Sequence, residues 1–192
     1  METPDGLPLV AFDGLADLER WLERHHGTAA GLWVAVARKD SGVPSPTAGD
    51  VNDAALCYGW ITGLRRSGDG VRYLQKITPR RPRSTWSQVN IARVAELTAA
   101  GRMRDPGLAE VAAARADGRW DAAYASQREA GVPEDLEAAL AENASARAAF
   151  EGLGRTERYR IVLGLLKART DRTRRARLDR AVTALAAGDR VP

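Results

Sequence analysis

Hydrophobic residues follow two different spacings along this chain, and the change falls near residue 83. Before that point, four short hydrophobic runs at 7–12, 32–37, 60–66 and 71–77 are typical of strands. Two segments between these runs carry hydrophobic residues at helical spacing: 15–22 and 51–58. Four strands and two helices in this order predict an α+β fold with a small, mostly antiparallel sheet and packed helices.

The helical spacing then continues from residue 84 to the end, which predicts an all-helical C-terminal part. Pro82 prevents an earlier start of the first of these helices, and Ser84 or Thr85 is its expected N-cap. We therefore divide the chain into three parts: an α+β sheet unit (1–83), linking helices (84–130) and a helical C-terminal region (131–192).

Composition indicates a globular protein of the cytoplasm. The 192 residues are 44% hydrophobic and 28% charged, and Cys57 is the single cysteine, so an intrachain disulfide is excluded. The first residues lack the basic and apolar regions of a secretory signal. No run of about 18 apolar residues predicts a transmembrane segment. We expect a cytoplasmic protein.

The positive charge is concentrated in two blocks. Residues 72–104 contain eight Lys/Arg and one acid, and residues 155–190 contain eleven Lys/Arg and four acids, although the net charge of the whole chain is only +4. Such blocks favour an anionic small molecule or an acidic surface as partner, and they leave a nucleic-acid partner as an alternative. Exposed helix faces carry similar charge, so this pattern alone does not decide between them.

Motifs for common enzyme chemistry are absent from the sequence. We find no phosphate-binding loop, no dinucleotide-binding glycine motif and no nucleophile elbow. The only histidines, His25 and His26, are adjacent, and with one cysteine they do not form a typical zinc site. We therefore predict no catalytic residues, metal or cofactor, and favour a non-enzymatic protein. An enzyme acting on a phosphorylated or carboxylated small molecule remains a further alternative.

The strongest candidate site is a loop loaded with arginines. Pro79 and Pro82 stiffen the segment that carries the arginines, and the helix expected to follow would bring free backbone N–H groups close to them. Guanidinium groups, N–H groups and an indole suit an anionic or planar ligand. The residues predicted to bind such a ligand are Trp60, Arg80, Arg81, Arg83, Ser84, Trp86 and Asn90.

The same stretch resembles a known family. The resemblance to the YdeI/OmpD-associated, or bacteriocin-protection, proteins extends over nearly the whole chain. It includes residues 55–63 (ALCYGWITG), 78–90 (TPRRPRSTWSQVN), 117–120 (DGRW), 133–136 (PEDL), 148–151 (AAFE) and 173–174 (TR). The resemblance implies a role in stress or antimicrobial-peptide resistance and, in some members, association with an outer-membrane porin. Family members commonly carry an aspartate where this chain has Thr62, and this departure argues against an enzyme or a metal at that strand. The combined prediction is a resistance protein that binds an anionic ligand or a protein partner.

Overall fold

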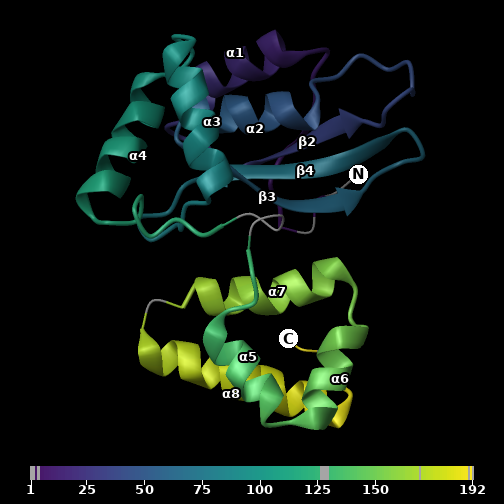
Figure 1. Cartoon of the computed structure of the whole chain (residues 1–192). Coiled ribbons are helices and arrows are strands. Elements are labelled where there is room, and N and C mark those ends of the chain that lie inside the picture. The colour runs from purple at the N-terminus through teal and green to yellow at the C-terminus, as the bar shows by residue number, and fades with distance from the viewer. Residues whose placement is uncertain (1–2, 4, 126–129, 169, 190, 192) are drawn as a thin grey trace. The chain divides into compact units, whose positions relative to one another are not determined.

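The computed structural model describes residues 3, 5–125, 130–168, 170–189 and 191 (Figure 1). Two compact units are present. Unit 1 comprises Met1–Trp86 and Asn90–Ala122, and unit 2 comprises Ser87–Val89 and Ala123–Pro192. The division into three parts at residues 83 and 130 stays a prediction.

Unit 1 is built on a four-stranded sheet. Its strands are β1 (Leu9–Ala11), β2 (Leu32–Ala37), β3 (Trp60–Ser67) and β4 (Arg72–Pro79), in the order β1-β2-β4-β3. β1 pairs with β2 in parallel, whereas β2 with β4 and β3 with β4 are antiparallel. The α+β prediction and the mostly antiparallel sheet are therefore confirmed.

Helix α2 is the centre of the core of unit 1. It runs over Ala48–Cys57 and packs against α1 (Leu15–His25), α4 (Asp105–Ala116), β3 and β4. Thr47 caps its N-terminus, because the Thr47 hydroxyl accepts a hydrogen bond from the Asp50 N–H at 3.1 Å and the Asp50 carboxylate accepts one from the Thr47 N–H at 2.9 Å. Nearly every residue of α2 from Val51 onward is buried, which explains why its sequence is so rich in small apolar side chains.

The first helix after the arginine loop begins later than predicted. Helix α3 is Gln88–Ala99, so the expectation that Ser84 or Thr85 caps it is wrong. The Ser84 hydroxyl instead accepts a hydrogen bond from the Arg81 N–H at 3.2 Å, and the Ser84 N–H donates to the Arg81 carbonyl at 2.8 Å. This turn uses the capping group locally, and helix α3 begins only at Gln88.

Helix α4 (Asp105–Ala116) approaches α2 very closely. A Cβ atom on Gly107 would lie 2.2 Å from the Cys57 carbonyl oxygen, so only glycine fits at this crossing. At the same junction Gly59 has a φ of +73°, a conformation that glycine adopts without strain. The two glycines allow the end of α2 to turn into β3 directly beneath α4.

A bulge in β3 shapes the far end of the sheet. The register shifts between Thr62 and Arg65, and the Gln75 side-chain amide donates to the carbonyls of Gly63 at 3.1 Å and Leu64 at 3.3 Å. Gln75 is itself buried, so its amide replaces the strand pairing that the bulge removes. From Gly63 to Ser67, the residues of β3 are exposed.

Unit 2 is a bundle of four helices: α5 (Glu134–Ala141), α6 (Ala144–Gly152), α7 (Arg155–Leu166) and α8 (Asp171–Ala187). The predicted helical C-terminal part is confirmed. Its core contains Leu136, Leu140, Phe150, Val162 and Leu165, with further residues of α7 and α8. No helix in the described ranges is long and apolar enough to cross a membrane.

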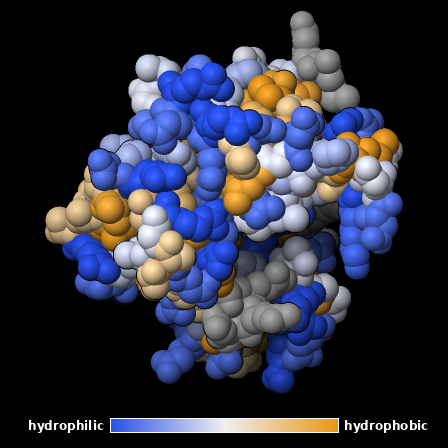
Figure 2. All heavy atoms as spheres, turned by 90° about the horizontal axis from the view of Figure 1, so that it is seen from above, coloured by the Kyte–Doolittle hydropathy of each residue, from blue (hydrophilic) through white to orange (hydrophobic). Residues whose placement is uncertain are grey.

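The face of the molecule seen in Figure 2 is mostly hydrophilic, and its hydrophobic residues lie in small separate groups. Large hydrophobic side chains that are exposed belong to different elements: Leu64, Val71, Val89 and Leu108. Scattered exposure of this kind is normal for a globular surface and marks no extended apolar interface. Charged side chains, rather than apolar ones, are therefore the distinguishing features of this surface.

Candidate functional site

The arginine loop is used largely for packing inside unit 1. Arg80 is only 8% exposed, and its guanidinium carbon lies 3.6 Å from the centre of the Trp86 ring. Arg80 also donates through Nη1 to the Thr85 carbonyl at 3.3 Å. Trp86 is 1% exposed and packs against the Trp120 ring at a centroid distance of 5.0 Å. Arg80, Trp86 and Trp120 thus form a stack that holds the loop in place.

Trp60 is also buried and lies at a different place in unit 1. Its indole N–H donates to the His26 carbonyl at 3.2 Å, and its ring meets Trp21 edge to face at 6.0 Å. His26, at the C-terminal end of α1, in turn contacts the Leu22 carbonyl through Nδ1 at 2.9 Å.

Only part of the predicted site reaches the surface. Arg81 and Arg83 are exposed, and Ser84 and Asn90 are half-buried. A ligand contacting Arg81 and Arg83 would meet two exposed charges at a turn, whereas Arg80 and Trp86 are buried. That the seven residues bind a ligand stays a prediction.

Arg119 holds the arginine loop in place, although it was not predicted from the sequence to be part of the site. It is 4% exposed and donates to the Ser84 carbonyl at 3.2 Å, to Glu110 at 2.7 Å and to Asp117 at 2.7 Å. Burial disfavours its charged form, but the hydrogen bonds to Glu110 and Asp117 outweigh burial and raise the pKa of Arg119. The DGRW segment thus has a structural role: its arginine ties α4 to the turn that precedes Trp86.

A second group of cations surrounds an open cleft at the end of the sheet. The cleft has a volume of about 500 Å³, and we call it the basic cleft. Two cations follow the end of β2, two belong to the end of β3, and an aromatic ring comes from β4. Its lining residues are Arg38, Lys39, Arg65, Arg66, Ser67 and Tyr73.

Strand pairing brings these residues together. Tyr73 on β4 is paired with Val36 on one side and with Ser67 on the other, so the ends of β2 and β3 flank the same ring. The Arg65 guanidinium lies 4.4 Å from the centre of the Tyr73 ring, and its Nε donates to Gln75 at 3.2 Å. Arg65 is therefore held in place although it is exposed, and Lys39 and Arg66 are exposed as well.

Asp69, the acidic residue near the basic cleft, already accepts hydrogen bonds from the backbone. The Asp69 carboxylate accepts hydrogen bonds from the N–H groups of Val71 at 2.9 Å and Arg72 at 2.6 Å. These backbone hydrogen bonds, with the charges of Arg72 and Arg38, lower the pKa of Asp69. Asp69 thus stabilises the hairpin turn, and among the residues that the structure describes, the cleft lining has four positive charges and no acid. Within the described part of the chain, no group of three acid, histidine or cysteine side chains is placed to hold a metal ion.

Two family models match the chain. A model described as a domain of unknown function, DUF8412, covers residues 10–110, more than half of the sequence. The chain belongs to this family. A second model, described as bacteriocin-protection, YdeI or OmpD-associated, matches residues 129–188. Neither the curated proteins nor the solved structures gave a match.

The two matches locate the resemblance seen in the sequence. A relation to the YdeI/OmpD-associated proteins is shown, and it rests on the helices of unit 2. The runs 55–63 and 78–90, which carried much of the resemblance, lie inside the DUF8412 match instead. The basic cleft therefore belongs to the DUF8412 domain.

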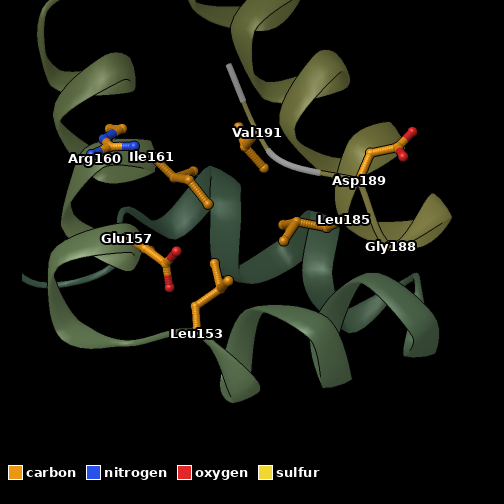
Figure 3. A pocket seen from close by; sticks show the side chains of 8 residues that line it. All are labelled: Leu153, Glu157, Arg160, Ile161, Leu185, Gly188, Asp189 and Val191. Carbon is orange, nitrogen blue, oxygen red and sulfur yellow. The ribbon is translucent and has the colours of Figure 1, made fainter.

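The YdeI/OmpD-associated region has hollows of its own between α7 and α8. One, of about 410 Å³, is lined by residues that include Glu157, Ile161, Leu185 and Val191 (Figure 3). A neighbouring hollow of about 400 Å³ is lined by Arg160, Gly164, Arg177 and Arg180 together with Ile161 and Val191. No sequence pattern pointed to these hollows, because they depend on where the side chain of Val191 lies.

Proposed function

We propose that this chain is a cytoplasmic, non-enzymatic stress or antimicrobial-peptide resistance protein that binds an anionic ligand in the basic cleft. The observation that carries the proposal is the convergence of four cations and one aromatic ring on a single cleft, with no acid in its lining. The resistance role is taken from the description of the family that matches unit 2.

The geometry favours a compact ligand with two or more anionic groups. Lys39 and Arg66 are free to reorient toward a ligand, and Arg65 offers a positioned guanidinium beside the Tyr73 ring. A phosphate or carboxylate would pair with the guanidiniums, and a planar group would pack against the tyrosine. Phosphorylated or polycarboxylated small molecules therefore suit the cleft.

The basic cleft also has an advantage over the arginine loop. Binding in the loop would draw on Arg80 and Trp86, which are committed to the stack with Trp120. Binding in the cleft uses side chains that already face solvent, so less of the packing of unit 1 has to change. Arg81 and Arg83 then provide a matched control, because they are two exposed cations on the same unit.

A thermal-shift screen with nucleotides, sugar phosphates, dicarboxylates and short single-stranded DNA at low and high salt tests the proposal. A small anion at about a hundred times its Kd stabilises the protein by roughly 2.7 kcal/mol and raises the midpoint accordingly. We expect the combined variant Lys39→Ala and Arg66→Ala to abolish this shift and the combined variant Arg81→Ala and Arg83→Ala to keep it.

If instead the Arg81→Ala and Arg83→Ala variant loses the shift and the Lys39→Ala and Arg66→Ala variant keeps it, the ligand binds at the arginine loop. Binding in the basic cleft would then be refuted. Shifts produced only by DNA, and only at low salt, would establish the nucleic-acid alternative. Turnover of a bound compound would establish the alternative that the chain is an enzyme. The resistance role is tested separately, by comparing survival under an antimicrobial peptide of cells with and without the chain.

A further inference from the structure

The two hollows between α7 and α8 adjoin each other, because they share lining residues. Arg160, Ile161 and Val191 line both hollows, and the remaining lining residues come from α7, α8 and the segments next to them. Figure 3 shows Ile161 and Leu185 on opposite sides, with Val191 reaching over from the C-terminal segment. We call the combined space the α7–α8 groove.

A reversal of the chain brings Val191 to this place. Gly188 adopts a φ of +73° at the end of α8, its N–H donates to the Leu185 carbonyl at 3.1 Å, and the Asp189 N–H donates to the Ala184 carbonyl at 2.9 Å. Val191 then packs, half-buried, against the core of unit 2. The groove therefore already accommodates one aliphatic side chain, that of Val191.

The two ends of the α7–α8 groove differ in charge. Glu157 and Asp189 line one hollow, and Arg177 and Arg180 line the other. The Arg177 side chain is fixed by donating to the Gly164 carbonyl at 2.5 Å, whereas Arg160 and Arg180 are exposed. The arginine end is thus positioned to receive carboxylates next to an apolar floor formed by Ile161, Leu165 and Ala181.

We propose that the α7–α8 groove binds an acidic segment of a partner protein, which inserts an aliphatic side chain where Val191 lies and places carboxylates beside Arg160 and Arg180. Val191 is then an internal occupant that the partner displaces. The inference does not depend on the ligand of the basic cleft. It rests on the seated valine and on charge complementarity.

Competition by a tethered occupant has a measurable effect. A segment attached to the same chain is present at a high effective concentration, so it weakens the apparent affinity for any partner. Replacing Val191 with serine removes most of its apolar contact but leaves the backbone unchanged. The Val191→Ser variant should therefore bind a partner peptide about fivefold more tightly, as expected from freeing a half-buried valine.

The probe is a fluorescein-labelled dodecapeptide in which aspartate alternates with leucine, titrated with the full-length chain and followed by anisotropy. We expect tighter binding by Val191→Ser and at least about tenfold weaker binding by the combined variant Arg160→Ala and Arg180→Ala. The combined variant Arg172→Ala and Arg175→Ala, which removes two exposed cations of α8 outside the groove lining, should bind as the unchanged chain does.

Equal loss of affinity in both arginine pairs would overturn the proposal, because it would show general charge attraction. Equal binding of a peptide with lysine in place of aspartate would overturn it too. If Val191→Ser lowers the helix signal in circular dichroism, methyl NMR of the unchanged chain decides instead. The acidic peptide should then shift Ile161, Leu185 and Val191, and unshifted methyl signals would refute the site.

Discussion

Replacing Gly107 with alanine would test how closely α4 approaches α2. The new Cβ would lie 2.2 Å from the Cys57 carbonyl oxygen and 2.8 Å from the Cys57 carbonyl carbon. Both are backbone atoms at the end of a buried helix, so neither can rotate away as a flexible side chain would. The contact can be relieved only if α4 moves away from α2.

The expected cost follows from two opposing effects. Overpacking of this kind costs about 1–3 kcal/mol, and more where backbone must shift. Replacing glycine with alanine also stabilises the helix by up to about 1 kcal/mol, because alanine has the higher helix propensity. We therefore expect Gly107→Ala to lower the free energy of unfolding of unit 1 by about 2 kcal/mol and its thermal midpoint by roughly 5 °C or more.

Gly164→Ala is the matched control. Gly164 lies in the interior of α7, and a Cβ there would meet no atom within 4 Å. Only the propensity effect then remains, so this variant should be more stable by up to about 1 kcal/mol. The same chemical change thus has opposite signs at two helical glycines.

Tryptophan fluorescence can follow unit 1 separately, because all five tryptophans of the chain lie in that unit. Far-UV circular dichroism reports helices of both units. We expect Gly107→Ala to shift the fluorescence transition to lower temperature and Gly164→Ala to change only the circular dichroism transition. A fluorescence midpoint for Gly107→Ala equal to that of the unchanged chain would refute the close approach of α4 to α2.

Three further predictions concern charged and polar contacts of unit 1. The Lys76 and Trp33 hydrogen bonds lower the pKa of Asp5 to about 2 from 3.8, so this carboxylate stabilises the fold above about pH 4 and the contribution is lost as the pH falls through 2. Asp5→Asn should therefore flatten the dependence of the fluorescence midpoint on pH between 4 and 2, and an unchanged slope would contradict this assignment. Arg119→Met should cost about 3 kcal/mol in urea unfolding, because it leaves the partly buried Glu110 without its partner. Burial and the hydrogen bond to Glu23 raise the pKa of Tyr58 to about 12, which the tyrosinate absorbance should show as a late titration that moves to lower pH in Glu23→Gln.

The strands and most helices could be predicted because each carries its own local signal. The run 32–37 became β2 with the same bounds, and the helical spacing after residue 130 became the bundle of unit 2. The start of α3 was mispredicted because Ser84 bonds to Arg81 in a turn, a choice that the capping pattern does not reveal. Tertiary contacts such as the hydrogen bond from Arg119 to the Ser84 carbonyl can override the local preference for a helix start.

The candidate site was harder to predict for a physical reason. Proximity in sequence drew attention to the arginines at 80, 81 and 83, but Arg80 packs on Trp86 inside the unit. The cations of the basic cleft come from the ends of two strands that are about 25 residues apart in the sequence. Only the pairing of both strands with β4 brings them to one ring, and pairing partners are not visible in a single sequence.

The strand order of unit 1 has a consequence for synthesis. β2 is buried, yet its antiparallel partner β4 ends only at Pro79, and Leu32 pairs with Ile77. At about 5–20 residues per second, a ribosome needs roughly 2–8 seconds to make the chain between these strands. During that interval the apolar β2 segment lacks its antiparallel partner β4. The nascent chain therefore exposes a hydrophobic strand that chaperones would recognise. The sheet order thus makes the speed of translation a factor in the yield of folded protein.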